Sequence, residues 1–218
     1  MFIGHFAVGF AAKRWAPRTS LGVLLAAPLL ADMLFPVLVL AGVERAHIVE
    51  GETPFLHLSL DSYPWSHSLL MDLVWAALFA GIVWWRAKDR AAALVVAIGV
   101  LSHWVLDWIT HRPDMPLWPG GPEYGLGLWY SLRWTVVVES VMLAVGVALY
   151  VAATAAKDRT GRLALAGLAA LLALAYVGNV MSPPPPGIGA VAVTGVVAAV
   201  LMPLWAWWID RHREPVGR

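Results

Sequence analysis

Apolar runs long enough to cross a lipid bilayer dominate this sequence and restrict what it can fold into. A membrane-spanning helix needs about 20 predominantly apolar residues, and the 218-residue chain contains six such runs. Only 13% of its residues are charged, against about 25% in a typical soluble domain. We therefore predict an all-α, polytopic membrane helix bundle that forms one integral membrane domain over residues 1–218. The expected spans are Leu21–Gly42, His67–Trp85, Ala91–Ile109, Trp134–Ala156, Leu163–Val180 and Ile188–Ile209.

A short apolar segment, Phe2–Ala12, precedes these runs. As a helix it extends only about 16 Å and cannot cross the bilayer alone. It is either an interfacial helix or a segment tucked partway into the bundle. The run that follows is too long for a cleaved signal core of about 7–15 residues, so a signal anchor is favoured over cleavage after Ala31.

The distribution of lysine and arginine indicates the orientation, because cytoplasmic connections of membrane proteins are enriched in them. Arg45, Arg112 and Arg133 fall on one side of the expected topology, and the other twelve basic residues fall on the opposite side. We therefore expect both termini in the cytoplasm. The twelve are Lys13, Arg14, Arg18, Arg86, Lys88, Arg90, Lys157, Arg159, Arg162, Arg211, Arg213 and Arg218.

Ionisable residues inside the spans are the candidates for chemistry, since a charge near mid-membrane costs at least about 2.5–3.5 kcal/mol. His103, Asp107 and His111 are spaced four residues apart, so they share one face of a helix. A rise of 1.5 Å per residue places Asp32 and His103 about 20 Å, Asp107 about 25 Å, Glu139 about 27 Å and His67 about 28 Å above the basic residue at the expected cytoplasmic end of each span. Four helices or segments thus bring polar groups to the outer half of the bilayer.

These residues define a candidate metal site built from nitrogen and oxygen ligands, because the chain has no cysteine. Such a ligand set suits zinc, with iron or manganese as alternatives. Asp61, His111 and Glu139 are candidate catalytic residues that would carry protons or orient ligands, with Asp114 as a further choice. On the same depth scale His111 lies at about 31 Å, near the water at the mouth of the site. The candidate ligands are His5, Asp32, His67, His103 and Asp107.

Several motifs together resemble the YdjM-like family of small bacterial inner-membrane proteins, which are usually described as membrane-bound metal-dependent hydrolases. The residues that carry the resemblance lie in Gly4–Phe10, Leu29–Leu38, Tyr63–Leu70, Ser102–Gly121 and Gly125–Trp129, in the family's order. The resemblance places the five candidate ligands at the family's histidine and aspartate positions. One departure is Pro64–Ser66, where the family tends to carry an arginine–threonine element, and this leaves a shared substrate open.

The residues and the resemblance together predict a metal-dependent hydrolase whose site opens to the periplasmic side of the inner membrane. A lipid or lipid-linked phosphoester is the expected substrate class, and the net charge of +1 gives no reason to expect a nucleic-acid partner. Two alternatives remain: a small proton-coupled transporter that uses the same carboxylates, and a non-catalytic structural or assembly protein. The oligomeric state stays open.

The last two spans are expected to serve as scaffold. The site is predicted within residues 1–140, while residues 160–210 carry no ionisable group between Arg162 and Asp210. Small residues such as Gly167 and Gly195 would let neighbouring helices approach closely.

Overall fold

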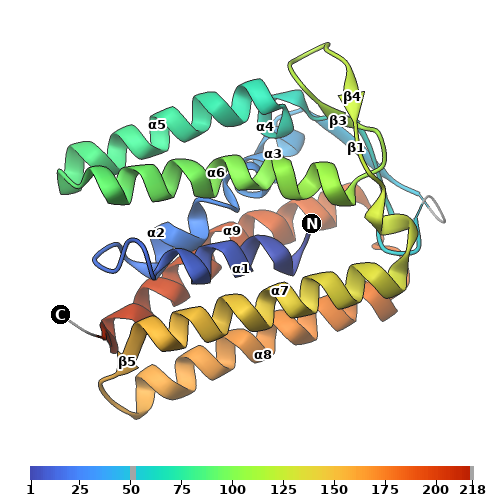
Figure 1. The fold of residues 1–218 in the computed structure, drawn as a ribbon. Helices are drawn as coiled ribbons and strands as arrows, with labels where there is room; N and C mark the ends of the chain where they lie inside the picture. Colours follow the sequence, from blue (N-terminus) through green and yellow to red (C-terminus); the bar gives the residue numbers. More distant parts are fainter. Residues whose placement is uncertain (50–52, 217–218) are drawn as a thin grey trace.

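Five long apolar helices form the body of the protein (Figure 1). A computed structural model describes residues 1–49 and 53–216 of the chain. Within them, five helices are long and apolar enough to cross a membrane, which confirms the predicted helical membrane bundle. Large apolar side chains such as Leu78, Leu94 and Leu174 remain exposed on their outer faces, as expected for surfaces that contact lipid. The five helices are α5 (Leu69–Ala87), α6 (Arg90–Thr110), α7 (Leu132–Ala153), α8 (Arg159–Met181) and α9 (Ile188–Arg211).

The expected first span, Leu21–Gly42, is wrong as a single continuous helix. It is divided into α2 (Leu21–Ala26) and α3 (Leu30–Leu40), which extend only about 9 Å and 16 Å. Pro28 lies between them, and a proline has no backbone N–H and clashes with the carbonyl four residues before it. The break leaves the Pro28 carbonyl outside the helical hydrogen-bond pattern.

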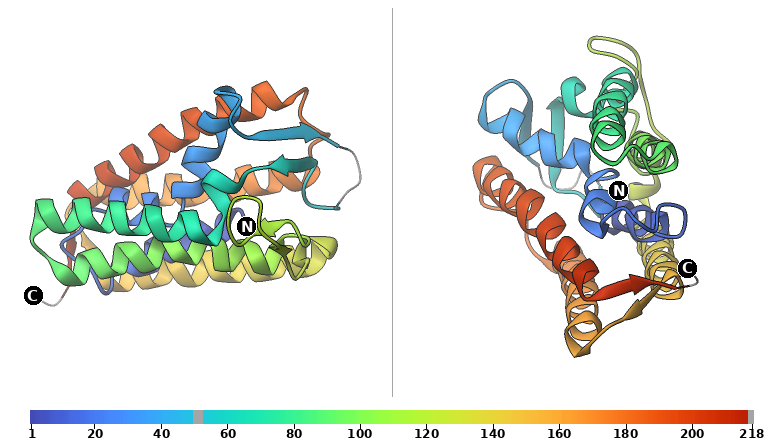
Figure 2. Two further views of the ribbon diagram at one scale, coloured as in Figure 1. Left: turned by 90° about the horizontal axis from the view of Figure 1, so that it is seen from above. Right: turned by 90° about the vertical axis from the view of Figure 1, so that its left-hand side faces the viewer.

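The short N-terminal segment enters the bundle, which decides between the two placements that the sequence allowed. Helix α1 (Ile3–Ala12) is buried along most of its length. It lies between the α5–α6 pair and the α7–α8 pair, in contact with α6 and α7 (Figure 2). At Gly146 of α7 an added Cβ would collide with the backbone of Ala7, so glycine permits this close approach. The ring of Phe10 then packs on Tyr150, with centroids 5.7 Å apart.

The basic connections gather at one end of the bundle, here called the basic end. Lys13 is buried there, with Nζ 2.6 Å from Asp210 Oδ2 and 2.9 Å from the Thr19 carbonyl. Strands β5 (Thr154–Ala156) and β6 (Arg213–Pro215) pair antiparallel beside it. Arg18 lines one cavity with Arg86, Lys88 and Arg90. This clustering agrees with the predicted topology, although Arg218 lies outside the described residues.

Two irregular segments cover the opposite end, here called the loop end. Strands β1 (Arg45–Ile48) and β2 (Leu58–Ser62) form an antiparallel hairpin that leads into α4 (Pro64–His67). The second segment contains β3 (Met115–Pro116), β4 (Glu123–Tyr124) and the 3-10 helix η1 (Leu128–Tyr130). This second segment folds back onto α6, where the Leu126 and Gly127 amides donate to the carbonyls of Trp108 and His111.

Candidate metal centre

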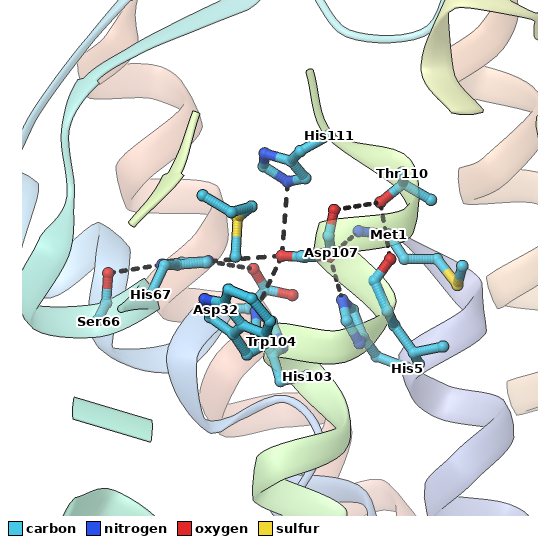
Figure 3. Close-up of polar contacts among 12 residues, drawn as sticks. Met1, His5, Asp32, Ser66, His67, His103, Trp104, Asp107, Thr110 and His111 are labelled. Atoms are coloured by element: carbon cyan, nitrogen blue, oxygen red, sulfur yellow. Dashed lines mark hydrogen bonds and ion pairs between the residues drawn. The ribbon is translucent and has the colours of Figure 1, made fainter. Parts of the chain in front are cut away.

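Asp107, in the last turn of α6, is the centre of a buried cluster of histidines (Figure 3). Its Oδ2 lies 3.1 Å from Nε2 of His103, 3.5 Å from Nε2 of His111 and 4.0 Å from Nε2 of His67. Its Oδ1 lies 3.0 Å from Nε2 of His5 and also contacts the Met1 nitrogen. One carboxylate therefore faces four imidazoles.

The cluster draws its side chains from four separate segments of the chain. His103 and Asp107 share one face of α6, as their spacing predicts, and His5 projects from α1. The His5 ring stacks on His103, with centroids 4.1 Å apart. His67 ends α4, and its Nε2 lies 3.5 Å from Oδ1 of Asp32 in the first turn of α3. All five candidate ligands named from the sequence thus lie in one cluster.

The helix break at Pro28 orients His103. The Pro28 carbonyl lies 2.8 Å from Nδ1 of His103, and a carbonyl can only accept a hydrogen bond. The N–H of the His103 imidazole is therefore on Nδ1, and Nε2 points at Asp107 with a free lone pair when the ring is neutral. A histidine that donates one nitrogen to a backbone carbonyl and presents the other is the usual arrangement of a metal ligand.

His67 is oriented by a second chain of hydrogen bonds, through Ser66 to Glu44. Ser66 Oγ lies 2.6 Å from both Nδ1 of His67 and Oε2 of Glu44. Because the Glu44 carboxylate accepts, the Ser66 hydroxyl donates to it and itself accepts from the His67 Nδ1–H. Glu44 is buried and also accepts from the backbone N–H groups of Trp65 and Ser66, each at 2.9 Å. His67, like His103, presents Nε2 to the cluster.

His111 is buried inside the cluster, so its expected position near the water at the mouth of the site is wrong. The depth estimate assumed that water begins where α6 ends, whereas the returning segment places the Trp129 ring on the imidazole, with centroids 4.1 Å apart. Nδ1 of His111 lies 3.0 Å from Oδ1 of Asp114, and this leaves Nε2 directed at Asp107.

Charges at the loop end shift the pKa values around His111. Burial would lower the pKa of His111, but Asp107 and Asp114 outweigh it and raise that pKa above its ordinary value. Burial would likewise raise the pKa of Asp114, but its hydrogen bonds to His111 and Arg112 hold that pKa below the usual range. Burial and the charge of Asp114 raise the pKa of the Tyr63 phenol well above normal, so its hydroxyl stays protonated and donates to the Asp114 carbonyl.

The cluster has the spacing and the donor atoms that a divalent metal requires. Ligand atoms about 2.0–2.2 Å from a tetrahedral zinc lie roughly 3.3–3.6 Å from one another, and the contacts of Asp107 Oδ2 with imidazole nitrogens span 3.1–4.0 Å. His5 Nδ1 is buried and makes no hydrogen bond within the described residues, and the buried His103 Nε2 lies within ion-pair distance of the Asp107 carboxylate. In the described part of the chain, two groups of three residues could hold an ion: His5, His103 and Asp107, and Asp32, His67 and His103.

One side of the cluster remains open. The Asp32 side chain is 44% exposed, whereas those of His67 and Asp107 are 6% and 3% exposed. Asp32, His67, Asp107 and His111 line one end of a cavity of about 340 Å³. The remaining lining comes chiefly from apolar side chains of α3, α9 and the segment before β2. Among these cluster residues, Asp32 is therefore the one with the most exposed side chain.

Glu139 and Asp61, the other two candidate catalytic residues, lie in different surroundings. Glu139 is buried on α7, and its Oε2 accepts from the backbone N–H groups of Phe2 and Gly4 at 2.8 and 3.1 Å. It thereby holds the first turn of α1 in place. Asp61 is an exposed residue of β2, with Oδ2 2.8 Å from His47 Nδ1. The Asp61 carboxylate thus pairs with His47 and, among the described residues, makes no contact with the cluster.

Pro28, Glu44, Ser66 and Tyr63 contribute to the site but were missed as site residues in the sequence. Ser66 precedes a candidate ligand and Pro28 interrupts an apolar run, so the positions of both in the sequence could have suggested a role. Nothing in the sequence around Glu44 suggests such a role, because Glu44 lies 22 residues from Ser66 and contacts it only when the β1–β2 hairpin folds back.

Comparison with known proteins places the chain in a family. No curated protein and no solved structure matches it. Residues 1–183 match the family described as YdjM inner membrane protein, and this range contains every residue of the histidine–aspartate cluster. With most of its length matched, the chain belongs to the YdjM inner membrane protein family.

Proposed function

We propose that this membrane protein is a metal-dependent hydrolase that acts on a lipid or lipid-linked phosphoester. The ion would be held by His5, Asp32, His67, His103 and Asp107. The observation that supports this most directly is that imidazoles and carboxylates from four segments meet at one buried point, while the outer nitrogens of His67 and His103 are held by protein acceptors. Both histidines therefore turn Nε2 toward the cluster, as histidines that bind a metal do.

The ligand set suits zinc, with iron or manganese as alternatives, because nitrogen and oxygen donors are the only ones offered. When bound, such an ion lowers the pKa of a water molecule, which supplies a nucleophile near neutral pH, and polarises a phosphoryl oxygen. Asp32, the exposed ligand, borders the cavity from which substrate would approach.

Residues around the ligands have supporting roles in this proposal. His111 is hydrogen-bonded to Asp114 and borders the same cavity, so it is placed to pass a proton to a leaving group. Glu139 acts as a positioning residue, because it fixes the turn of α1 from which His5 projects.

The orientation of the protein in the membrane is inferred from the distribution of its basic residues. The basic end, with Lys13, Arg86 and Arg213, would lie in the cytoplasm. Asp107 lies in the last turn of α6, toward the loop end. The site would therefore open toward the periplasmic side.

Metal analysis of the purified protein tests the proposal. We expect about one equivalent of a transition metal per chain, lost on His103→Ala and retained in His212→Ala. His212 is the matched control, since it pairs with Asp158 at the basic end and touches no cluster residue. Wild-type protein that holds no metal after purification and zinc dialysis would refute the proposal.

Turnover separates this function from the transport alternative. In nanodiscs we expect metal-loaded protein to release phosphate or a phosphorylated headgroup from phospholipid, and His103→Ala to lose this activity. Metal-free protein that drives proton flux in liposomes, with the flux abolished by Asp32→Asn, would favour a transporter.

A further inference from the structure

The apolar cavity beside the cluster has the character of a lipid-chain site. We propose that it binds one acyl chain of a membrane phospholipid, with the headgroup phosphate at the Asp32 side of the cluster. As a statement about substrate this rests on the proposed function, but chain binding itself requires no metal.

The walls of the cavity are apolar once they leave the cluster. Met33 and Pro36 of α3 form one side, and Phe55 and Leu56 cover the loop end. Beyond the cluster, the polar side-chain groups among the described lining residues are the Asn179 amide, which donates to the Phe55 carbonyl at 3.2 Å, and the indole N–H of Trp129. A soluble phosphoester would leave this surface without a partner, whereas an acyl chain gains about 0.8 kcal/mol for each methylene that it buries.

Small residues of α9 create the space. Ala192, Gly195, Ala198 and Ala199 line the cavity on one face of the helix. At Gly195 an added Cβ would lie 3.1 Å from Pro36, so α3 and α9 already touch there and a larger side chain would close the space. The volume of about 340 Å³ is at the lower end of ligand pockets, roughly 300–1,000 Å³, which suits one chain and not a whole diacyl lipid.

The wall that separates this cavity from the bilayer is a single helix thick. On the face of α9 opposite the lining residues, Val193, Val197 and Val200 are each about half exposed. Helix α9 is also long and apolar enough to span a membrane. A phospholipid in the surrounding leaflet therefore needs to pass only the α3–α9 wall to place a chain inside. The cavity is polar where the cluster lines it and chiefly apolar beyond, and this amphipathic character matches a lipid with a charged head.

Photocrosslinking tests this directly. The protein is reconstituted in vesicles that contain a phosphatidylglycerol with a diazirine on one acyl chain, irradiated, and mapped by peptide mass spectrometry. We expect labels on α3 and on the lining face of α9. Ala199→Phe should reduce this labelling about tenfold, since lost contact with two methylenes is sufficient for that change. Val200→Phe, which adds to a lipid-facing valine of the same helix, should leave it unchanged.

Failure of this inference is distinguishable from failure of the proposed hydrolase. Labelling of α3 and α9 that persists in metal-free His103→Ala supports chain binding whatever the turnover assay shows. Labels spread evenly over the outer faces of α5 and α7, or unchanged by Ala199→Phe, would overturn it even if the protein hydrolyses a soluble phosphoester. Should Ala199→Phe fail to fold, Ala198→Leu provides the same comparison.

Discussion

Removing the Ser66 hydroxyl tests whether the hydrogen bonds that link Glu44, Ser66 and His67 orient His67 for metal binding. In Ser66→Ala the Nδ1–H of His67 loses its acceptor, and the ring is free to rotate or to move its proton to Nε2. Loss of such an outer hydrogen bond typically weakens metal affinity by about 10–100-fold, which corresponds to about 1.4–2.7 kcal/mol. We expect the zinc dissociation constant of Ser66→Ala to rise within that range.

The stability effect of the same change should be separable from the metal effect. Glu44 keeps its two backbone donors, Trp65 N and Ser66 N, and loses only the Ser66 Oγ bond. A hydrogen bond to a charged group contributes about 1.5–3 kcal/mol, so metal-free Ser66→Ala should unfold at a modestly lower temperature. Thermal unfolding of the metal-free wild type and Ser66→Ala in detergent measures this loss of stability.

Competition for zinc against a fluorescent chelator, on detergent-solubilised protein, measures the affinity itself. Ser102→Ala is the matched control, because Ser102 Oγ donates at 2.6 Å to the Gly99 carbonyl on α6 and contacts no imidazole. An affinity of Ser66→Ala equal to that of Ser102→Ala would refute the reasoning, since His67 would then bind metal without its orienting partner or not at all.

Three further predictions follow from other contacts. Pro28→Ala should favour joining α2 to α3 and withdraw the carbonyl that orients His103. We expect its zinc affinity to fall about 10–100-fold, whereas the control Pro17→Ala should keep the wild-type affinity. Equal affinities of the two variants would contradict this expectation. Glu139→Ala leaves the partly buried Phe2 N–H and the buried Gly4 N–H without this acceptor and should lower stability by about 1–3 kcal/mol. Glu139→Gln, which keeps an acceptor oxygen, should unfold at a higher temperature than Glu139→Ala. Lys13→Met removes the cation that pairs with the Asp210 carboxylate, which keeps its hydrogen bond from Tyr150. Adding Asp210→Asn should recover part of the lost thermal stability, and a double variant less stable than Lys13→Met would argue against the pair.

Local pattern was sufficient to predict the helices and part of the cluster. Apolar runs near 20 residues gave the five long helices at nearly their observed bounds, because a helix in lipid satisfies its backbone hydrogen bonds within itself. The four-residue spacing of His103 and Asp107 predicted their shared face, because 3.6 residues per turn fixes that relation within one helix. Helical rise also brought Asp32 and His67 to a similar depth.

Contacts between distant segments could not be predicted in this way. The rise of α6 placed His111 in water, whereas the returning segment with Trp129 buries it. Ala192 and Gly195 of α9 line the same cavity as Asp107 and His111 of the α6 segment, a juxtaposition that no pattern within one segment indicates.

The amino-acid sequence is sufficient to predict a membrane helix bundle, the end at which its basic residues gather, and five histidine and aspartate residues as candidate metal ligands. Those properties depend on composition and on repeats within one segment. The hydrogen bond from His103 to the Pro28 carbonyl, and the link from His67 through Ser66 to Glu44, become visible only in the folded chain. The partners in these contacts lie 75 and 22 residues apart, and only packing of the whole chain brings such residues within hydrogen-bond distance.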